Sequence, residues 1–382
     1  MLEAQNHRGL TTNPLTTGDG VAFELDEIYV PLGLVERKQR DRRSGDVSPE
    51  RGSQLYESEA QDEIIKTFQL DEFFEQVLRL GQSKRIAIIG EPGAGKTTLL
   101  QKIAAWVLDN TEDVPIWISL ADLQGKSLKA YLLQDWLENA TRTVYVSEEV
   151  QKALGELFNS ERVWLLLDAV DEMAIGAQGF APLQLIANQI AGWVADARVV
   201  LTCRFNIWDA GKNALEAFET YRNLDFSYGD AQTPDHVNQF IRCWFKSNLE
   251  LAERLRAELD QPGRERIKDA VKNPLRLALL CRSWTLGKGG LPNTKAGLYQ
   301  QFTEALYEWK KDRFITSSTQ RHELNKALGE LALRAISEEK TKYRLRHRLV
   351  SSVLNNPDKE LFGLALQLGW LNQVGLAAEV EN

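Results

Sequence analysis

The stretch from Gly90 to Thr97 has the residue types and the spacing of a phosphate-binding loop. It matches the pattern G-x-x-x-x-G-K-[ST] at every fixed position. Glycines let the backbone approach a phosphate chain closely, and the loop leads into a predicted helix, whose first N–H groups favour anions. We expect Lys96 to contact the β- and γ-phosphates and Thr97 to ligate Mg²⁺. We assign nucleotide contacts to Gly90, Glu91, Pro92, Gly93, Ala94, Gly95, Lys96, Thr97 and Thr98.

Three acidic residues follow a strongly apolar stretch further along the chain. Residues 163–167 predict a buried strand, and Asp168 comes directly after it, as in the Walker B element of nucleotide-binding proteins. Because ligands of a parallel sheet bind at the carboxyl ends of its strands, we expect Asp168 to hold Mg²⁺, directly or through water. Asp171 and Glu172 follow within one turn and are expected to polarise an attacking water. The alternative is that all three are ordinary acids that cap a loop.

A basic residue comes shortly after the next predicted strand, at residues 198–202. The chain continues with Cys203 and Arg204, so a guanidinium is expected near the acidic strand end. Arg204 would read the γ-phosphate through charge-assisted hydrogen bonds. A salt bridge from Arg204 to a nearby acid is the alternative. The predicted catalytic set is Lys96, Asp171, Glu172 and Arg204.

The segments that must position these residues alternate between strand and helix patterns. Strands are predicted at 85–89, 116–119, 163–167, 198–202 and 221–226, with helices at 96–109, 127–139, 148–158 and 182–195. This alternation predicts an α/β fold with a parallel sheet covered by helices on both faces. After Gly229 the pattern is helical throughout, with Thr233 as the expected N-cap of the first helix. Upstream, we expect an extended arm or strand at 22–35, a flexible linker at 36–54 and amphipathic helices at 58–80.

Composition excludes several classes of protein. The chain of 382 residues carries a net charge of −8, which argues against coating nucleic acid through bulk attraction. Neither a signal peptide nor an apolar stretch of membrane-spanning length occurs, so we expect a cytoplasmic protein without membrane contact. The three cysteines form no CxxC pair and the four histidines are scattered, which gives no support to a zinc site or a His-dependent triad.

Taken together, these elements resemble the NACHT family of signal-transduction ATPases with numerous domains (STAND NTPases). Residues Asp168–Glu172 are similar to the family's Asp-Gly-x-Asp-Glu, with Ala169 where a small residue is expected. Thr202–Arg204 is similar to the family's strand-end Thr-x-Arg. Pro274 resembles the proline of the family's helical domain, which contacts the nucleotide. The resemblance covers roughly residues 82–382.

The resemblance implies a P-loop NTPase (NACHT) domain at 58–228, an all-helical lid domain at 229–316 and a winged helix at 317–382. An extended arm and linker at 1–57 precede them. The family's winged helix continues into a segment with a histidine that touches the β-phosphate. This sequence stops at Asn382 without such a histidine, so we expect it to end within an incomplete winged helix.

The function implied by the resemblance is an ATP-binding switch that hydrolyses slowly, with ATP/ADP and Mg²⁺ as cofactors. Such proteins rest with ADP, open after exchange for ATP and often self-associate, in defence or stress responses. No motif identifies an upstream ligand or an effector. The alternatives are an AAA-like ATPase that acts on DNA, a small-molecule kinase and a non-hydrolysing scaffold. The alternating basic run Lys340–Arg348 is a candidate nucleic-acid contact, although we favour a solvated loop and helix start.

Overall fold

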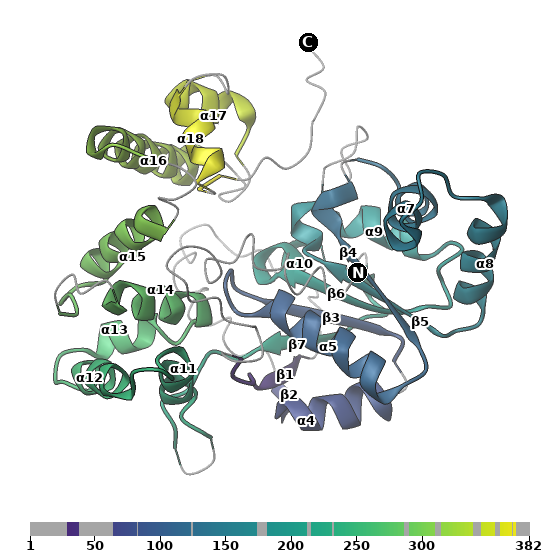
Figure 1. Cartoon of the computed structure of the whole chain (residues 1–382), viewed down its shortest axis with the longest axis horizontal. Helices are drawn as coiled ribbons and strands as arrows, with labels where there is room; N and C mark the ends of the chain where they lie inside the picture. The colour runs from purple at the N-terminus through teal and green to yellow at the C-terminus, as the bar shows by residue number, and fades with distance from the viewer. Residues whose placement is uncertain are drawn as a thin grey trace, which may run out of the picture.

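A seven-stranded sheet forms one half of the molecule (Figure 1). The computed structural model describes residues 29–37, 64–81, 83–123, 125–173, 182–211, 215–230, 233–285, 290–309, 315–338, 345–355, 360–368 and 370–371. The strands are β1 Leu34–Arg37, β2 Ile64–Phe68, β3 Arg85–Gly90, β4 Val114–Ser119, β5 Val163–Asp168, β6 Arg198–Arg204 and β7 Glu219–Asn223. Their order across the sheet is β2-β1-β7-β3-β6-β5-β4.

The five strands from β3 to β7 run parallel to one another, as the alternating pattern predicts. β6 lies between β3 and β5, so the end of the Arg204 strand separates the phosphate-binding loop from the acidic strand end. β1 is the exception, because it runs antiparallel to both β2 and β7. The predicted fold class is confirmed, with one antiparallel strand in an otherwise parallel sheet.

Side chains along each strand alternate between two hydrophobic cores, one on each face of the sheet. On β3, Ala87 and Ile89 join one core, whereas Ile86 and Ile88 join the other. The first core is completed by helices that follow β4, β5 and β6, and the second by helices that flank the β3 strand. The first group comprises η4 Leu120–Leu123, α6 Leu128–Tyr131, η5 Leu132–Trp136, α7 Leu137–Thr141, α8 Glu148–Asn159, η6 Val170–Glu172, α9 Pro182–Ile190 and α10 Phe205–Gly211. The second comprises α4 Leu70–Phe73, η3 Phe74–Arg79 and α5 Lys96–Asn110.

The remainder of the described chain is helical and lies beside the sheet (Figure 1). The helices are α11 His236–Trp244, α12 Leu249–Leu259, α13 Glu265–Ala270, α14 Pro274–Thr285, α15 Lys295–Trp309, α16 Ser318–Glu338, α17 His347–Leu354 and α18 Glu360–Gln367. Helices α11 to α15 share one core, and α16 to α18 share another with Tyr307 of α15. None of the described helices is both long enough and apolar enough to cross a bilayer. The winged helix stays a prediction.

Two stretches of chain cross between the sheet and the first helical core, and they lie side by side. On the N-terminal stretch, Val30 and Leu32 are buried in the helical core, whereas Leu34 is buried in the sheet core. The second crossing follows β7. The backbone N–H of Leu224 donates to the carbonyl of Gly33 at 2.9 Å, which joins the two crossings to each other.

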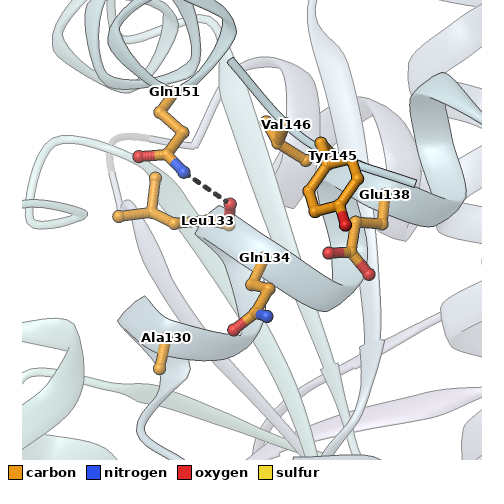
Figure 2. Close-up of a pocket in the computed structure, with 7 residues that line it drawn as sticks. All are labelled: Ala130, Leu133, Gln134, Glu138, Tyr145, Val146 and Gln151. Carbon is orange, nitrogen blue, oxygen red and sulfur yellow. Dashed lines mark hydrogen bonds between the residues drawn. The ribbon is translucent and has the colours of Figure 1, made fainter. Parts of the chain in front are cut away.

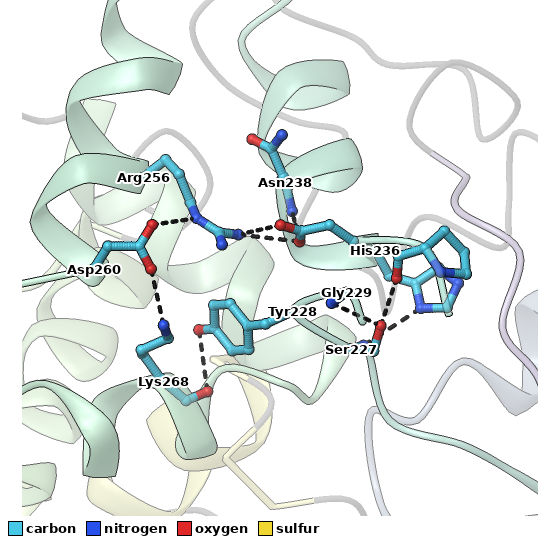
Figure 3. A network of polar contacts seen from close by, with 10 residues as sticks. Ser227, Tyr228, Gly229, His236, Asn238, Arg256, Asp260 and Lys268 are labelled. Carbon is cyan, nitrogen blue, oxygen red and sulfur yellow. Dashed lines mark hydrogen bonds and ion pairs between the residues drawn. The ribbon is translucent and has the colours of Figure 1, made fainter. Parts of the chain in front are cut away.

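A polar network fixes the chain after the second crossing to the helices (Figure 3). Arg256 of α12 pairs with Asp235 and with Asp260, both at 2.8 Å. The Tyr228 hydroxyl donates to the carbonyl of Lys268 at 3.2 Å. The charged groups of Arg256 and Lys268 lie 5.0 and 4.4 Å from the centre of the Tyr228 ring. Because Tyr228, α12 and α13 are tied together in this way, the helices next to the crossing form one unit.

Three sequence-based expectations are wrong. Ile64–Phe68 is a strand rather than part of an amphipathic helix, because it pairs with β1, a long-range contact that local periodicity does not encode. Glu36 and Arg37 belong to β1 rather than to a linker. The N-cap of α11 is Asp235, whose carboxylate accepts from the N–H of Asn238 at 2.9 Å, and not Thr233. Residues 1–28 and 38–57 of the predicted arm and linker, residues 58–63 of the predicted amphipathic helices and much of the basic run lie outside the described residues.

We expect β1 to be integral to the sheet, and Leu34 tests this. Its side chain is fully buried, so Leu34→Ala should lower the free energy of unfolding by about 2–5 kcal/mol. The matched control is Leu80→Ala, since the Leu80 side chain is 72% exposed. Urea unfolding followed by circular dichroism measures both. Equal stability of the two variants would show that β1 does not belong to the core.

Candidate functional site

The loop between β3 and α5 takes a backbone path that requires glycine at two positions. Gly93 has φ +77° and Gly95 has φ +78°, in the left-handed region that side chains disfavour. Gly95 is also the N-cap of α5, so the loop runs directly into the helix N-terminus. This is the geometry in which successive backbone N–H groups gather around an anion.

Lys96 places its amine inside the curve of the loop. Its Nζ donates to the carbonyl of Gly90 at 3.0 Å and to that of Glu91 at 2.9 Å. Burial lowers the pKa of the Lys96 amine, and the nearby carboxylates of Asp171 and Asp168 oppose that change. A partly buried ammonium held on carbonyl oxygens is well placed to turn to the stronger acceptors of a phosphate.

Asp168 lies at the end of β5 and accepts two hydroxyl hydrogen bonds. Thr97 Oγ1 donates to its Oδ1 at 3.1 Å, and Thr202 Oγ1 donates to the same atom at 2.6 Å. Burial raises the pKa of the Asp168 carboxyl, and these hydrogen bonds from Thr202 and Thr97 counteract that effect. Thr202 also accepts from the N–H of Ala169 at 2.7 Å, so β6 fixes both the carboxylate and the turn that follows it.

Arg204 is paired with both of the acids that follow β5. Its Nε lies 2.7 Å from Asp171 Oδ2, and its backbone N–H donates to Asp171 Oδ1 at 3.0 Å. One terminal nitrogen lies 3.6 Å from Glu172 Oε1. The Asp171 side chain is only 5% exposed, whereas that of Glu172 is 35% exposed. Burial and then the charge of Asp171 raise the pKa of the Glu172 carboxyl. Glu172 is therefore the acid that a water molecule can reach.

The predicted residue in the helical part lies next to the loop. Pro274 is the first residue of α14, and its two neighbours touch the loop directly. Asn273 Nδ2 donates to the carbonyl of Pro92 at 3.2 Å, and the N–H of Leu275 donates to the carbonyl of Gly93 at 3.3 Å. All the predicted site residues thus lie at the edge of the sheet where β3, β5 and β6 end, or in the helix that faces it.

Several residues at this site were not assigned from the sequence. The motif includes Thr202 without giving it a role, and its position on the strand between β3 and β5 explains its contact with Asp168. Asn223 ends β7, and its amide donates to the carbonyl of Ala94 at 2.9 Å. Leu32 packs against Gly95, where a Cβ would lie 3.2 Å from its Cδ1. Asn223 and Leu32 carry no local signal, because only the sheet brings them to the loop.

The residues present fit a nucleotide phosphate chain with Mg²⁺. Two left-handed glycines and a helix N-terminus form the anion cradle, and a hydroxyl beside a carboxylate supplies the oxygen ligands that Mg²⁺ prefers. Among the described residues no group of three His, Cys, Asp or Glu side chains could hold a metal by itself.

A separate pocket of about 320 Å³ lies between η5 and α8 and contains none of the predicted site residues (Figure 2). The side chains of Leu133, Gln134, Glu138, Tyr145 and Gln151 are among those that line it. Gln151 donates to the carbonyl of Leu133 across it at 3.4 Å. Its lining holds one ionisable acid and no basic group, so it does not resemble a phosphate site.

The loop, the acidic strand end and the strand order define a P-loop NTPase. Residues 84–248 match the family model described as the NACHT domain. This part of the chain is therefore a NACHT-type P-loop NTPase domain, as the motifs indicate.

Two curated relatives match part of this chain. The transcription termination factor Rho of Borreliella burgdorferi is 36% identical over 104 residues, which are 25% of this chain and 20% of Rho. The GTPase Der of Mycobacterium avium is 28% identical over 149 residues, 39% of this chain and 30% of Der. The chain thus matches less than a third of the length of these relatives.

Among solved structures, Cdc6p from Pyrobaculum aerophilum has a TM-score of 0.37 and 13% identity, with 84% of this chain and 83% of that one covered. The Aeropyrum pernix Orc1 protein in complex with DNA has a TM-score of 0.39 and 13% identity, with 85% of each chain covered. Structural similarities with TM-scores as low as these do not support any assignment of function.

The turn after β5 provides a test of the backbone geometry. Ala169 has φ 58° and ψ 60°, a left-handed conformation that costs an alanine about 1 kcal/mol more than a glycine. We expect Ala169→Gly to leave the protein as stable as before or more stable by up to about 1 kcal/mol. The control is Ala105→Gly on the exposed side of α5, which should cost about 1 kcal/mol. Thermal unfolding compares the two, and a loss at Ala169 as large as that at Ala105 would contradict the left-handed turn.

Proposed function

We propose that the chain is an ATP-controlled switch in which the helical part responds to the nucleotide bound at the loop. The observation that carries the proposal is the direct contact of α14 with the phosphate-binding loop. The N–H of Leu275 donates to the carbonyl of Gly93, and Arg276 lies 3.8 Å from Glu91. A change in the loop on nucleotide binding or hydrolysis would therefore act on the helical part at once.

In the proposed reaction, Lys96 exchanges the carbonyls of Gly90 and Glu91 for phosphate oxygens and stabilises the charge that develops on them. Glu172 orients the attacking water and accepts its proton. Asp171 holds Arg204 in place, and Arg204 would read the γ-phosphate. Mg²⁺, when bound, neutralises phosphate charge, and Thr97 and Asp168 would hold it.

We extend the proposal from the NACHT resemblance to the behaviour of the whole protein. It would bind ATP in preference to GTP, rest with ADP, hydrolyse slowly and self-associate in the ATP state. Its role would lie in a defence or stress response in the cytoplasm. The domain limits of 58–228, 229–316 and 317–382 belong to the same proposal, as do the nucleotide contacts of Thr98 and Pro274.

An AAA-like ATPase that acts on DNA is the second candidate function. The observation that favours it is the exposed basic start of α17, where Arg346 and Arg348 flank His347. Lys340, Lys342 and Arg344 of the same basic run lie outside the described residues. The net charge of −8 favours the switch instead, because it opposes bulk attraction to DNA.

Two substitutions separate nucleotide binding from hydrolysis. We expect Lys96→Ala to weaken ATP binding about tenfold or more, since a charged hydrogen-bonding partner is lost. Glu172→Gln should still bind ATP but hydrolyse it about 100-fold more slowly. Titration with a fluorescent ATP analogue and a phosphate-release assay measure the two effects. Lys152→Ala and Glu156→Gln on the exposed face of α8 are the controls. Turnover by Glu172→Gln at the wild-type rate would remove Glu172 from the mechanism.

The response to DNA distinguishes the two candidate functions. A switch should release phosphate at the same low rate with and without added DNA, because its nucleotide cycle is governed by the helical part. A DNA-dependent ATPase should turn over several times faster when its polymer is present. Steady-state ATPase assays with single-stranded and duplex DNA, at low and physiological salt, decide between them. Stimulation that persists at physiological salt would overturn the switch.

A further inference from the structure

The carbonyl groups of the loop all face hydrogen-bond donors. Each backbone carbonyl from Gly90 to Ala94 accepts at least one hydrogen bond. In chain order the donors are Lys96 Nζ, Lys96 Nζ together with the N–H of Ala94, Asn273 Nδ2, the N–H of Leu275 and Asn223 Nδ2. Two of these donors, from Asn273 and Leu275, belong to the helical part.

Asn273 serves both the loop and its own helix. Its side chain is almost fully buried, and its Nδ2 donates to the carbonyl of Pro92 while its Oδ1 accepts from the N–H of Arg276 at 3.3 Å. A backbone N–H requires an oxygen partner and a carbonyl requires a donor, so these two contacts fix which way the amide points. The oxygen caps the start of α14, and the nitrogen is left for the loop.

The approach of α14 to the loop is too close for a side chain at position 93. A Cβ on Gly93 would lie 2.6 Å from the Cβ of Leu275 and 2.9 Å from Asn273 Oδ1. Glycine is therefore required at this position by the helical part as well as by the left-handed backbone. The contact between the two parts is backbone on backbone, with the amide of Asn273 inserted beside it.

Holding these carbonyls also orients the N–H groups of the loop. The carbonyl of Pro92 and the N–H of Gly93 belong to one planar peptide and point in opposite directions. With the carbonyl held by Asn273, the Gly93 N–H points away from the helical part. A peptide that has lost this partner can rotate, and an N–H that must first be reoriented binds an anion less tightly.

We propose that Asn273 is a positioning residue that couples the docking of the helical part to the affinity of the loop for phosphate. When α14 is docked, its amide holds the Pro92–Gly93 peptide in the orientation that binds phosphate. When the helical part moves away, the hydrogen bonds from Asn273 and Leu275 are lost together. The coupling rests on the function proposed above, and it acts through the carbonyl side of the loop rather than through contact with the nucleotide.

The donors from Asn273 and Leu275 are held on the same rigid part of the helical region. The N–H of Phe226, just after the second crossing, donates to the carbonyl of Lys272 at 2.9 Å, directly before Asn273. Lys268 of the network around Tyr228 lies on the helix that leads into Asn273 (Figure 3). A rotation at the crossing therefore carries Asn273 with it.

The test compares Asn273→Ser with Asn248→Ser. Asn248 caps α12 through its Oδ1, which accepts from the N–H of Leu251 at 3.2 Å, and it does not touch the loop. Serine caps helices nearly as well as asparagine and carries no charge, so both variants should keep their helix. Only Asn273→Ser removes the donor to Pro92.

We expect Asn273→Ser to release a fluorescent ADP analogue roughly two- to tenfold faster than wild type in stopped-flow measurements, while Asn248→Ser releases it at the wild-type rate. Without nucleotide, hydrogen exchange at residues 93–95 should be faster in Asn273→Ser and unchanged in Asn248→Ser. Asn273→Asp, which also keeps the cap, serves if the serine variant does not fold, and it should show the same faster exchange.

The outcomes separate this coupling from the proposed function. If wild type binds the analogue and Asn273→Ser releases it at the same rate, the coupling is overturned and the switch stands. If both asparagine variants release it equally fast, the effect comes from general loosening of the helical part, and the coupling is again overturned. Wild-type protein that binds no nucleotide overturns the proposed function and the coupling with it.

Discussion

A loop that binds an anion with its backbone must have donors for its own carbonyls elsewhere, and most of this structure is arranged around that constraint. The donors come from three directions: the lysine of the loop itself, the end of β7 and the start of α14. Each has a separate support. The lysine begins α5, Asn223 ends a strand held between β1 and β3, and Asn273 caps a helix in a different core. The loop is therefore held by its own helix α5, by the sheet through β7 and by the helical part through α14.

The placement of β6 between β3 and β5 supplies the other half of the site. It brings a hydroxyl to Asp168 and a guanidinium to Asp171, so the two acids have different partners although they are close in sequence. Asp171 is buried in its ion pair with Arg204, whereas Glu172 remains partly exposed to solvent. The Arg204 salt bridge, considered from the sequence as an alternative to phosphate sensing, is present, and it fixes the guanidinium at the end of β6. The two interpretations are compatible.

Local pattern predicted the parts of the site that local chemistry determines. The loop from Gly90 to Thr97, the acid that ends β5 and the arginine that ends β6 follow from short motifs and from the rule that parallel strands present ligands at their carboxyl ends. The sequence also predicted four of the strands and most of the helices closely.

What the sequence did not predict depends on partners far away along the chain. Asn273 and Pro92 are 181 positions apart, and Asn223 and Ala94 are 129 apart. The strand Ile64–Phe68 has apolar residues that suit a helix equally well, and only its pairing with β1 decides the matter. The left-handed turn at Ala169 had a motif signal, since the family has glycine there, but alanine hid the conformation.

The hydrogen bond between Gly33 and Leu224 has a mechanical consequence. The chain crosses between the sheet and the helical core at these two adjacent points, so both covalent connections between the two bodies lie at one place. On the N-terminal crossing, Leu32 is anchored in one body and Leu34 in the other. Two residue steps of extended chain span only about 7 Å. The bodies therefore cannot separate at this point by more than a few ångströms unless one leucine leaves its core. A force applied to the chain before Val30 would act on the same short segment from Leu32 to Leu34.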